Sequence, residues 1–189
     1  MSKKKKILLI LSNILQVVLI TVCSFLIVRN VCYNAIIVSH SSMYPTLNSG
    51  DYGYAIKTKY ALDHIKRFDI VIFTLDLDEN DQEEDKLIKR VIGLPGETIS
   101  FQGLQCDLYV DNNKIPQDFI DLETQAHTGI KTYTVPENCY FVLGDNRKNS
   151  KDSRFFGCVE KNKMEGILKI ITRHQNDDKS MELVPFRYY

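Results

Sequence analysis

The stretch KLIKRVIGLPG, residues 86–96, indicates the fold class of this 189-residue chain. Long and apolar side chains alternate from Lys86 to Ile92, and the run stops at the turn signal Gly93-Leu-Pro-Gly96. Successive side chains of a strand point to opposite faces of a sheet, so this alternation predicts a β-strand. Glycine and proline mark the turn that ends the strand.

Short apolar runs separated by turn signals continue on both sides of this stretch. They predict further strands at residues 35–38, 52–56, 69–73, 98–101, 108–110, 132–135, 140–143 and 166–172. Many short strands without alternating helical patterns are typical of a sandwich or barrel, so we predict a mainly β domain. Residues 60–67 carry a weak helical signal, and the acidic residues 76–85 are predicted to form a solvated loop.

Four consecutive lysines, Lys3 to Lys6, precede a stretch without charge at residues 7–28. A helix of this length crosses a hydrocarbon core of ~30 Å. A cleaved secretory signal has a shorter apolar region and small residues before its cleavage site, so we predict a membrane span at residues 7–28. The positive-inside rule places the basic tail of residues 1–6 in the cytoplasm and the domain of residues 29–189 outside it.

The composition excludes several classes of protein. Hydrophobic residues make up 44% and charged residues 25% of the chain, which argues against disorder and against many membrane spans. The 24 basic and 24 acidic side chains balance, and no basic face stands out, so we predict no nucleic-acid partner. The sequence has no Gly-rich phosphate loop and no zinc-like spacing of Cys and His, so we predict no cofactor and no metal.

The chain has an odd number of cysteines, which are Cys23, Cys32, Cys106, Cys139 and Cys158. Cys23 lies in the predicted span, and the spacing of the others does not reveal a connectivity. We expect all of them to be free buried thiols, because none of the four histidines is placed to activate a cysteine.

The first segment that can carry chemistry is SHSSMYPTL, residues 39–47. A serine just after a membrane helix is usually only a polar loop residue. Pro45 fixes its own φ angle and biases Tyr44 away from helix, so we expect a stiff, extended backbone that can hold a hydroxyl group. Taken alone, this segment leaves both interpretations open.

The second segment contains the pair Lys89-Arg90. Such a pair usually points into water. On a strand, however, Lys89 lies on the face opposite Ile88 and Arg90, and apolar neighbours lower the pKa of a lysine toward neutrality. A neutral amine can remove a proton from a serine hydroxyl, whereas the guanidinium of Arg90 stays charged and cannot.

The third segment is GDNRKNSKDSR, residues 144–154. Its residue types fit a polar turn rich in Asx motifs. They fit equally well a set of groups that orient a base and neutralise neighbouring charge. By itself this segment does not distinguish the two.

In this order behind an N-terminal anchor, SSMYPTL, KRVIGLPGE and GDNRKNSKDSR resemble bacterial type I signal peptidases over nearly the entire domain. The resemblance implies a serine endopeptidase. The residue directly before Met-x-Pro, Ser42 rather than Ser41, is its expected nucleophile, and Lys89 is its expected general base. The resemblance also implies supporting roles, in which Ser150 orients the lysine, Asp152 pairs with Arg154, and Asp145 pairs with Arg90.

The same resemblance implies the fold and the substrate. We expect a core of coiled antiparallel sheets with a small β insertion at about residues 99–134. The enzyme is expected to cut signal peptides from exported preproteins at Ala-x-Ala-like sites, in shallow subsites lined by Val38, Met43, Leu47 and Ile88. The expected partners are these signal peptides, the lipid bilayer, and secretion or pilus machinery.

Two points stay open at the level of sequence. His40 stands where family members usually carry glycine or a hydroxyl residue, so the second oxyanion donor is unassigned. His40 is a donor, a residue that tunes substrate choice, or an exposed loop residue. The alternative function is a non-enzymatic, signal-peptidase-like accessory factor for pilus assembly, which ranks second because the chain retains both Ser42 and Lys89.

Overall fold

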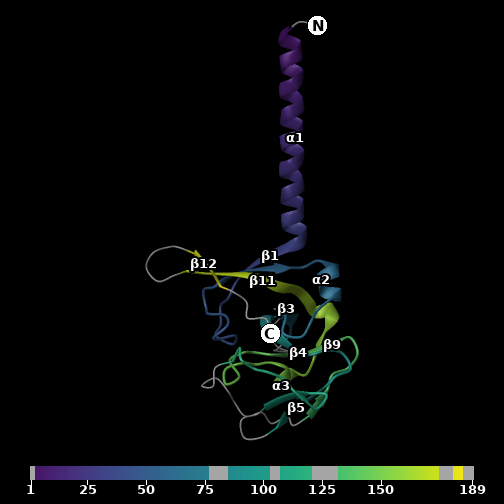
Figure 1. The fold of residues 1–189 in the computed structure, drawn as a ribbon, viewed down its shortest axis with the longest axis vertical. Helices are drawn as coiled ribbons and strands as arrows, with labels where there is room; N and C mark the ends of the chain where they lie inside the picture. Colours follow the sequence, from purple (N-terminus) through teal and green to yellow (C-terminus); the bar gives the residue numbers. More distant parts are fainter. Residues whose placement is uncertain (1–2, 77–84, 103–106, 121–131, 175–180, 185–189) are drawn as a thin grey trace. The chain divides into compact units, whose positions relative to one another are not determined.

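The computed structural model describes residues 3–76, 85–102, 107–120, 132–174 and 181–184. The chain divides into two compact units, Met1–Tyr33 and Asn34–Tyr189. The first unit is a helix, and the second is built mainly from antiparallel strands (Figure 1).

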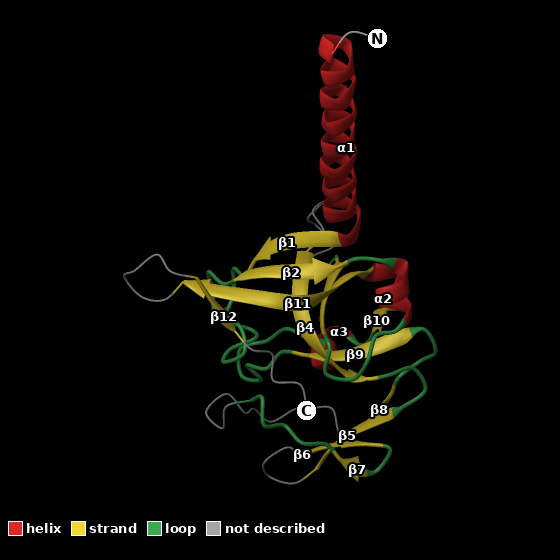
Figure 2. Cartoon of the chain, turned by 45° about the horizontal axis from the view of Figure 1, so that its top comes forward, coloured by secondary structure: helices red, strands yellow, loops and turns green. Residues whose placement is uncertain are grey.

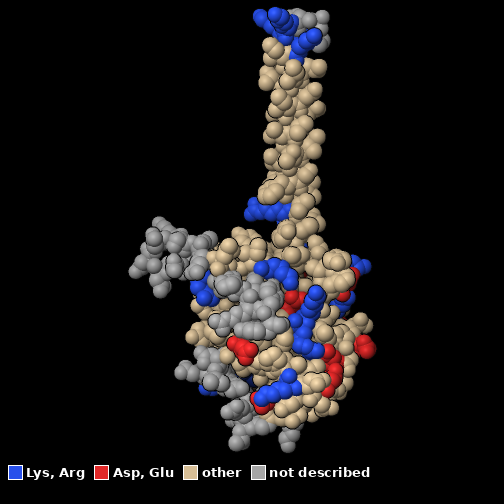
Figure 3. Space-filling model, viewed as in Figure 1, with Lys and Arg blue, Asp and Glu red and all other residues tan. Residues whose placement is uncertain are grey.

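Helix α1 spans Lys3–Cys32 and contains the predicted span of residues 7–28. At 1.5 Å per residue, its 30 residues extend about 45 Å, which exceeds the ~30 Å of a hydrocarbon core. Its length and composition suffice to cross a membrane. Figure 3 shows an uncharged surface between the lysines at its N-terminal end and Arg29.

The larger sheet contains the strand that was predicted at residues 86–92. Its order is β1-β2-β11-β3-β4-β9-β10, and β12 also pairs with β11 (Figure 2). The strands are β1 Tyr33–Ile37, β2 Tyr52–Ile56, β3 Ile70–Leu75, β4 Asp85–Gly93, β9 Cys139–Leu143, β10 Val159–Glu160, β11 Met164–His174 and β12 Met181–Val184.

The smaller sheet has the order β7-β6-β5-β8 and lies at the end of the domain opposite β1 (Figures 1 and 2). Its strands are β5 Thr98–Gln102, β6 Asp107–Val110, β7 Asn113–Lys114 and β8 Thr132–Thr134. These strands fall within the residues predicted as a β insertion. Short helices complete the domain, namely α2 Lys59–Asp63, α3 Ser153–Phe156 and the 3-10 turn η2 Lys161–Lys163.

Strand β4 is buried because it lies inside the larger sheet, between β3 and β9. Its N-terminal half is exposed or half-buried, whereas Lys89 through Gly93 are all buried. Ile92 packs with Ile99 of the smaller sheet in one apolar cluster, which joins the two sheets. Val91, on the opposite face of the strand, packs with Val71 and Phe73 in a second apolar cluster. The second half of β4 is therefore covered on both faces.

The mainly β fold is confirmed, and a strand lies at every predicted position. The weak helical signal at residues 60–67 corresponds to the single turn of α2, which Thr58 caps by accepting the Ala61 N–H. The predicted acidic loop lies mostly outside the described residues, which omit 77–84. Sequence analysis missed the two-residue strands β7 and β10, the strand β12, and helix α3.

The expectation that every cysteine is a free buried thiol is wrong. Cys139 and Cys158 form a disulfide, with Cα atoms 5.7 Å apart. They meet because β9 and β10 are antiparallel neighbours in which Val159 pairs with Tyr140, a pairing that spacing along the chain does not reveal. Cys23 is free but exposed on α1, and Cys32 is free and half-buried. Cys106 lies outside the described residues.

We predict that loss of this disulfide lowers the stability of the domain. The bond closes a loop with a sequence separation of 19 residues. Opening a loop of this size costs about 3 kcal/mol, because the unfolded chain regains conformational entropy. Denaturant unfolding of the full chain in detergent, for the parent and for a Cys139→Ser/Cys158→Ser variant, measures this difference. Cys23→Ser is the matched control, and equal midpoints for all three proteins would contradict the prediction.

Candidate active site

The segment around Ser42 is a tight turn. The Tyr44 N–H donates to the Ser41 carbonyl (3.0 Å), and the Leu47 N–H donates to the Met43 carbonyl (2.9 Å). Met43 and Leu47 are buried in an apolar cluster and anchor the turn. The expectation of an extended backbone is wrong here, because these hydrogen bonds fold the chain back on itself.

Ser42 and Lys89 lie side by side although 47 positions separate them in the sequence. The Lys89 Nζ atom is 2.9 Å from the Ser42 Oγ atom, and it donates to the Ile88 carbonyl at 3.0 Å. Lys89 is only 2% exposed, whereas Ser42 is half-buried. This distance is within the reach required of a base and a nucleophile.

Burial lowers the pKa of Lys89 from 10.5 to about 8. The cause is desolvation, which penalises the charged ammonium more than the neutral amine. Asp152 and Asp145 act in the opposite direction, because their negative charge favours the ammonium. Desolvation outweighs both carboxylates, so a usable fraction of Lys89 is neutral near neutral pH.

The third segment packs directly against the serine turn. The Asn146 N–H donates to the Ser42 carbonyl (3.0 Å), and its side-chain amide donates to the Ser41 carbonyl (3.2 Å). The Asn149 amide donates to the Ser41 hydroxyl at 3.0 Å. Sequence analysis did not select either asparagine, although the Asx-rich turn that it noted is the usual setting for such bonds.

Arg90 and Asp145 form a buried, bidentate ion pair. Arg90 donates from Nε to Oδ1 (2.9 Å) and from Nη2 to Oδ2 (2.6 Å). Both side chains are at most 2% exposed. The Thr46 hydroxyl contacts both partners, since it donates to Asp145 and accepts from Arg90. This pairing links the strand that carries Lys89 to the third segment and to the serine turn.

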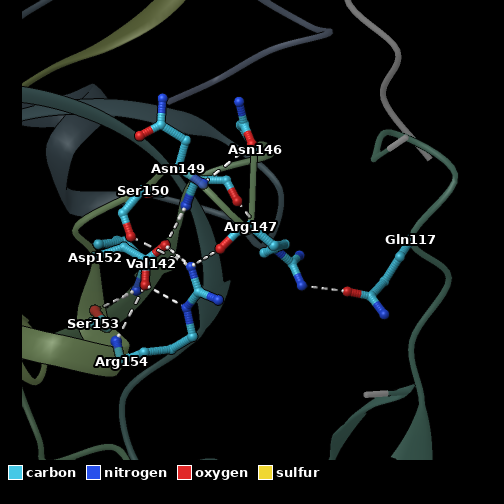
Figure 4. Close-up of polar contacts among 10 residues, drawn as sticks. Gln117, Val142, Asn146, Arg147, Asn149, Ser150, Asp152, Ser153 and Arg154 are labelled. Carbon is cyan, nitrogen blue, oxygen red and sulfur yellow. Dashed lines mark hydrogen bonds and ion pairs between the residues drawn. The ribbon is translucent and has the colours of Figure 1, made fainter. Parts of the chain in front are cut away.

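Asp152 and Arg154 form the other expected ion pair, at 2.8 Å. Figure 4 shows Asp152 beside Ser153 and Arg154. Its carboxylate accepts from the Gly144 N–H (3.0 Å) and from the Arg154 N–H (3.3 Å), and it caps α3. Ser153 is buried and accepts the N–H of Val142 at 2.9 Å. Asp152 therefore holds both ends of this segment.

Ser150 does not make the hydrogen bond to Lys89 that the sequence led us to expect. Its hydroxyl is buried and has no hydrogen-bond partner among the described residues. The contacts of Lys89 Nζ are instead Ser42 and the Ile88 carbonyl. Ser150 nevertheless lies close to the serine turn, because both press against Gly144. Only a residue without a side chain fits at that point.

A cavity of about 150 Å³ opens next to Ser42 and Lys89. Val38, Met43 and Ile88, three of the residues predicted to line the substrate pocket, line it together with Ile36 and other residues of β1, β3 and β4. Leu47, the fourth, does not line this cavity. It is fully buried and packs in the apolar core that supports the serine turn.

His40 is exposed and lies on the rim of the same cavity. The Ser42 N–H has no acceptor among the described residues. No group of three His, Cys, Asp or Glu side chains in the described part of the chain is placed to hold a metal ion. The chemistry that these residues support is proton transfer from a hydroxyl to a neutral amine, followed by nucleophilic attack.

Comparison with known proteins gives a consistent result. Residues 11–172 match the family described as signal peptidase, peptidase S26. A signal peptidase I of Bacillus caldolyticus is 35% identical over 161 residues, which cover 78% of this chain and 83% of that protein. Signal peptidase I S of Bacillus subtilis is 32% identical over 180 residues, which cover 90% of this chain and 91% of that protein.

A solved structure is also similar. The crystal structure of a signal peptidase I from Enterococcus faecalis is 32% identical in sequence and has a TM-score of 0.44. The match covers 56% of this chain and 97% of that one.

Proposed function

The chain belongs to the signal peptidase family, peptidase S26, and on that premise we propose that Ser42 is its nucleophile and Lys89 its general base. Its activity is that of a type I signal peptidase, a serine endopeptidase that processes signal peptides. The observation that carries the assignment of residues is the 2.9 Å contact between the buried Lys89 Nζ and Ser42 Oγ.

The reaction begins with proton transfer from Ser42 Oγ to the neutral Lys89 amine while Oγ attacks the scissile carbonyl carbon. The tetrahedral intermediate collapses to an acyl-enzyme as the Lys89 ammonium protonates the leaving amine. The lysine, neutral again, then takes a proton from a water molecule that attacks the ester. The bond between the carbonyl carbon and Ser42 Oγ breaks, and the Lys89 ammonium returns the proton to Oγ. Histidine and a third acidic group are not needed, as in other Ser-Lys enzymes.

The Ser42 N–H is the proposed oxyanion donor. Loss of one donor of this kind typically reduces the rate ~10²-fold or more. His40, on the rim of the cavity, stands where family members usually carry glycine or a hydroxyl residue. Its role as a second donor, as a residue that tunes substrate choice or as an exposed loop residue stays a prediction.

The cavity beside Ser42 supports a binding site for apolar side chains of the substrate. Its volume is about 150 Å³, and Val38, Met43 and Ile88 give it an apolar lining. We therefore assign it to the residues before the scissile bond. The preference for alanine at the −1 and −3 positions stays a prediction from the family resemblance.

We assign to the supporting residues the roles predicted for them. The Arg90–Asp145 pair holds the third segment against β4 and the serine turn, and the Asp152–Arg154 pair stabilises the segment itself. We assign Ser150 to orienting the lysine during the reaction. Its buried, unpartnered hydroxyl beside Gly144 supports this assignment, because a buried hydroxyl without a partner is costly and usually has a use.

We place the chain in a cell membrane, with residues 1–6 in the cytoplasm and the peptidase domain outside. The charge-free part of α1, residues 7–28, follows four lysines and supports this topology. Exposed apolar and aromatic side chains on β1, β2 and β11, namely Ile37, Tyr52, Tyr54 and Ile170, support the bilayer as a partner. An anchor raises the effective concentration of the enzyme where the apolar part of a signal peptide is embedded.

The alternative function is a non-enzymatic accessory factor for pilus assembly, and such a protein needs no nucleophile or base. The contact of a buried lysine with Ser42 favours the peptidase, because a buried amine costs stability and a binding role would not require it. Association with secretion or pilus machinery stays a prediction. A Ser42→Ala protein that still fulfils the cellular role would favour the alternative.

We predict that Ser42→Ala and Lys89→Met each reduce cleavage of an Ala-x-Ala preprotein by about 10³-fold or more. Lys89→Arg should be equally inactive, because a guanidinium does not lose its proton. Steady-state cleavage by the full chain in detergent measures the loss. The matched controls are Ser41→Ala, next to the nucleophile, and Lys66→Ala, an exposed lysine that does not line the cavity. Substantial activity in Ser42→Ala would rule out the assignment.

We predict that kcat/KM rises with pH and levels off above an apparent pKa of about 8. The neutral amine is the reactive form, so activity is lost as pH falls through this value and Lys89 becomes protonated. About one tenth of Lys89 is then neutral at pH 7, and about nine tenths at pH 9. Cleavage rates across this range, with a substrate that lacks ionisable groups near the scissile bond, measure the profile. If kcat/KM instead rises only near pH 10, Lys89 is solvated in the enzyme and the prediction is wrong.

We predict that the peptidase domain, residues 29–189, is accessible from outside the cell. A C-terminal epitope tag on the full chain should be removed when protease is added to intact cells without a wall, because the positive-inside rule retains the lysine tail in the cytoplasm. An N-terminal tag should be protected until the membrane is disrupted. The reverse pattern would contradict the topology.

A further inference from the structure

Residues 115–120, which follow strand β7 of the smaller sheet, contact the arginines that support the active site. The Gln117 side-chain carbonyl accepts from Arg147 Nη1 at 2.6 Å. The Phe119 ring lies under the guanidinium of Arg90, with 4.3 Å between Cζ and the ring centroid. Figure 4 shows Gln117 on a separate segment of chain, reaching toward Arg147. Two buried arginines of the site are thus contacted by one segment.

Of these two arginines, Arg147 has a side-chain nitrogen without a hydrogen-bond partner among the described residues. It is 5% exposed, and the unpartnered atom is Nη2. Its Nε atom donates to the Gly144 carbonyl at 3.0 Å, and its own carbonyl accepts from Arg154 at 2.8 Å. Burial lowers the pKa of Arg147 to about 10, even though Asp145 and Asp152 oppose this. With so few partners, the orientation of its guanidinium depends strongly on Gln117.

Gly144 is the point where a movement of Arg147 would reach the nucleophile. A Cβ atom on Gly144 would lie 2.5 Å from the Ser42 carbonyl oxygen and would overlap Ser150. The Gly144 N–H is held by Asp152 at 3.0 Å, and its carbonyl is held by Arg147 at 3.0 Å. Gly144 therefore packs closely against the serine turn, and this close packing is the path by which a shift at Gly144 would reach Ser42.

We propose that Arg147 is a positioning residue for the Ser42–Lys89 pair, and that Gln117 orients it from the smaller sheet. This inference rests on the proposed function. The hydrogen bond from Arg147 fixes the peptide of Gly144, that peptide supports the turn of Ser42, and Gln117 fixes the guanidinium. The residues after β7 thereby affect catalysis without touching the substrate pocket, which they do not line.

The test compares Gln117→Leu, Arg147→Met and the double variant, each in the full chain in detergent. Arg147→Met is expected to lower kcat by about 10- to 100-fold, because small displacements of a nucleophile have effects of this size. Gln117→Leu is expected to lower kcat by about 10-fold, with KM within about 2-fold of the parent in each case. Gln117→Glu retains an acceptor for Arg147 and is expected to restore the parental kcat.

The double variant separates positioning from stability. Gln117→Leu leaves a buried Arg147 nitrogen without an acceptor and should lower the unfolding midpoint. The double variant removes both polar partners, so its midpoint should return toward that of the parent while its kcat stays low, because the bond to Gly144 is absent. Asp118→Ala, an exposed neighbour of Gln117, is the matched control and should match the parent.

Two results would overturn the proposal. One is an unchanged kcat in a folded Arg147→Met protein, and the other is a kcat that recovers together with the midpoint in the double variant. Ser42→Ala, measured in parallel, separates the two levels of inference. If Ser42→Ala remains active, the proposed nucleophile is wrong. If Ser42→Ala is inactive and Arg147→Met equals the parent, only the positioning role fails.

Discussion

The burial of Lys89 is the constraint on which the rest of the site depends. An ammonium inside a protein loses its hydration, so burial favours the neutral amine, which is the form that can act as a base. The site must therefore be dry around the amine and still bring Ser42 within 2.9 Å of it. The position of β4 inside the larger sheet, with Val91 and Ile92 packed into apolar clusters on its two faces, meets the first requirement.

The neighbouring charges are arranged so that they do not cancel this effect. Asp145 and Asp152 both favour the charged lysine, but each is already paired, with Arg90 and Arg154. Paired carboxylates stabilise an ammonium less than free ones would, because the arginine charge offsets theirs. The Arg90–Asp145 pair also fastens the third segment to β4, and Asp152 holds the Gly144 N–H beside Ser42. Electrostatic tuning and mechanical support thus come from the same side chains.

The third segment is held from several directions at once. The disulfide between Cys139 and Cys158 brackets it, since residues 144–154 lie within the loop that this bond closes. Asn146 ties it to the serine turn, and Gln117 reaches it from the smaller sheet through Arg147. A segment that carries few apolar side chains cannot be fixed by hydrophobic burial, so polar and covalent links have to fix it.

Sequence alone was sufficient for features that depend on local pattern. The apolar helix at residues 7–28 follows from length and absence of charge, and the strands follow from apolar runs between turns. The order of the motifs indicated the family and selected Ser42 and Lys89, which lie 2.9 Å apart. Tertiary structure decided what depends on contacts between distant segments. It paired Cys139 with Cys158, placed Leu47 in the core instead of the pocket, left Ser150 without its expected bond to Lys89, and buried Arg147 against Gln117. Periodicity reports which face of an element is apolar, but the partner of a side chain is set by how sheets and turns pack, and that packing is non-local.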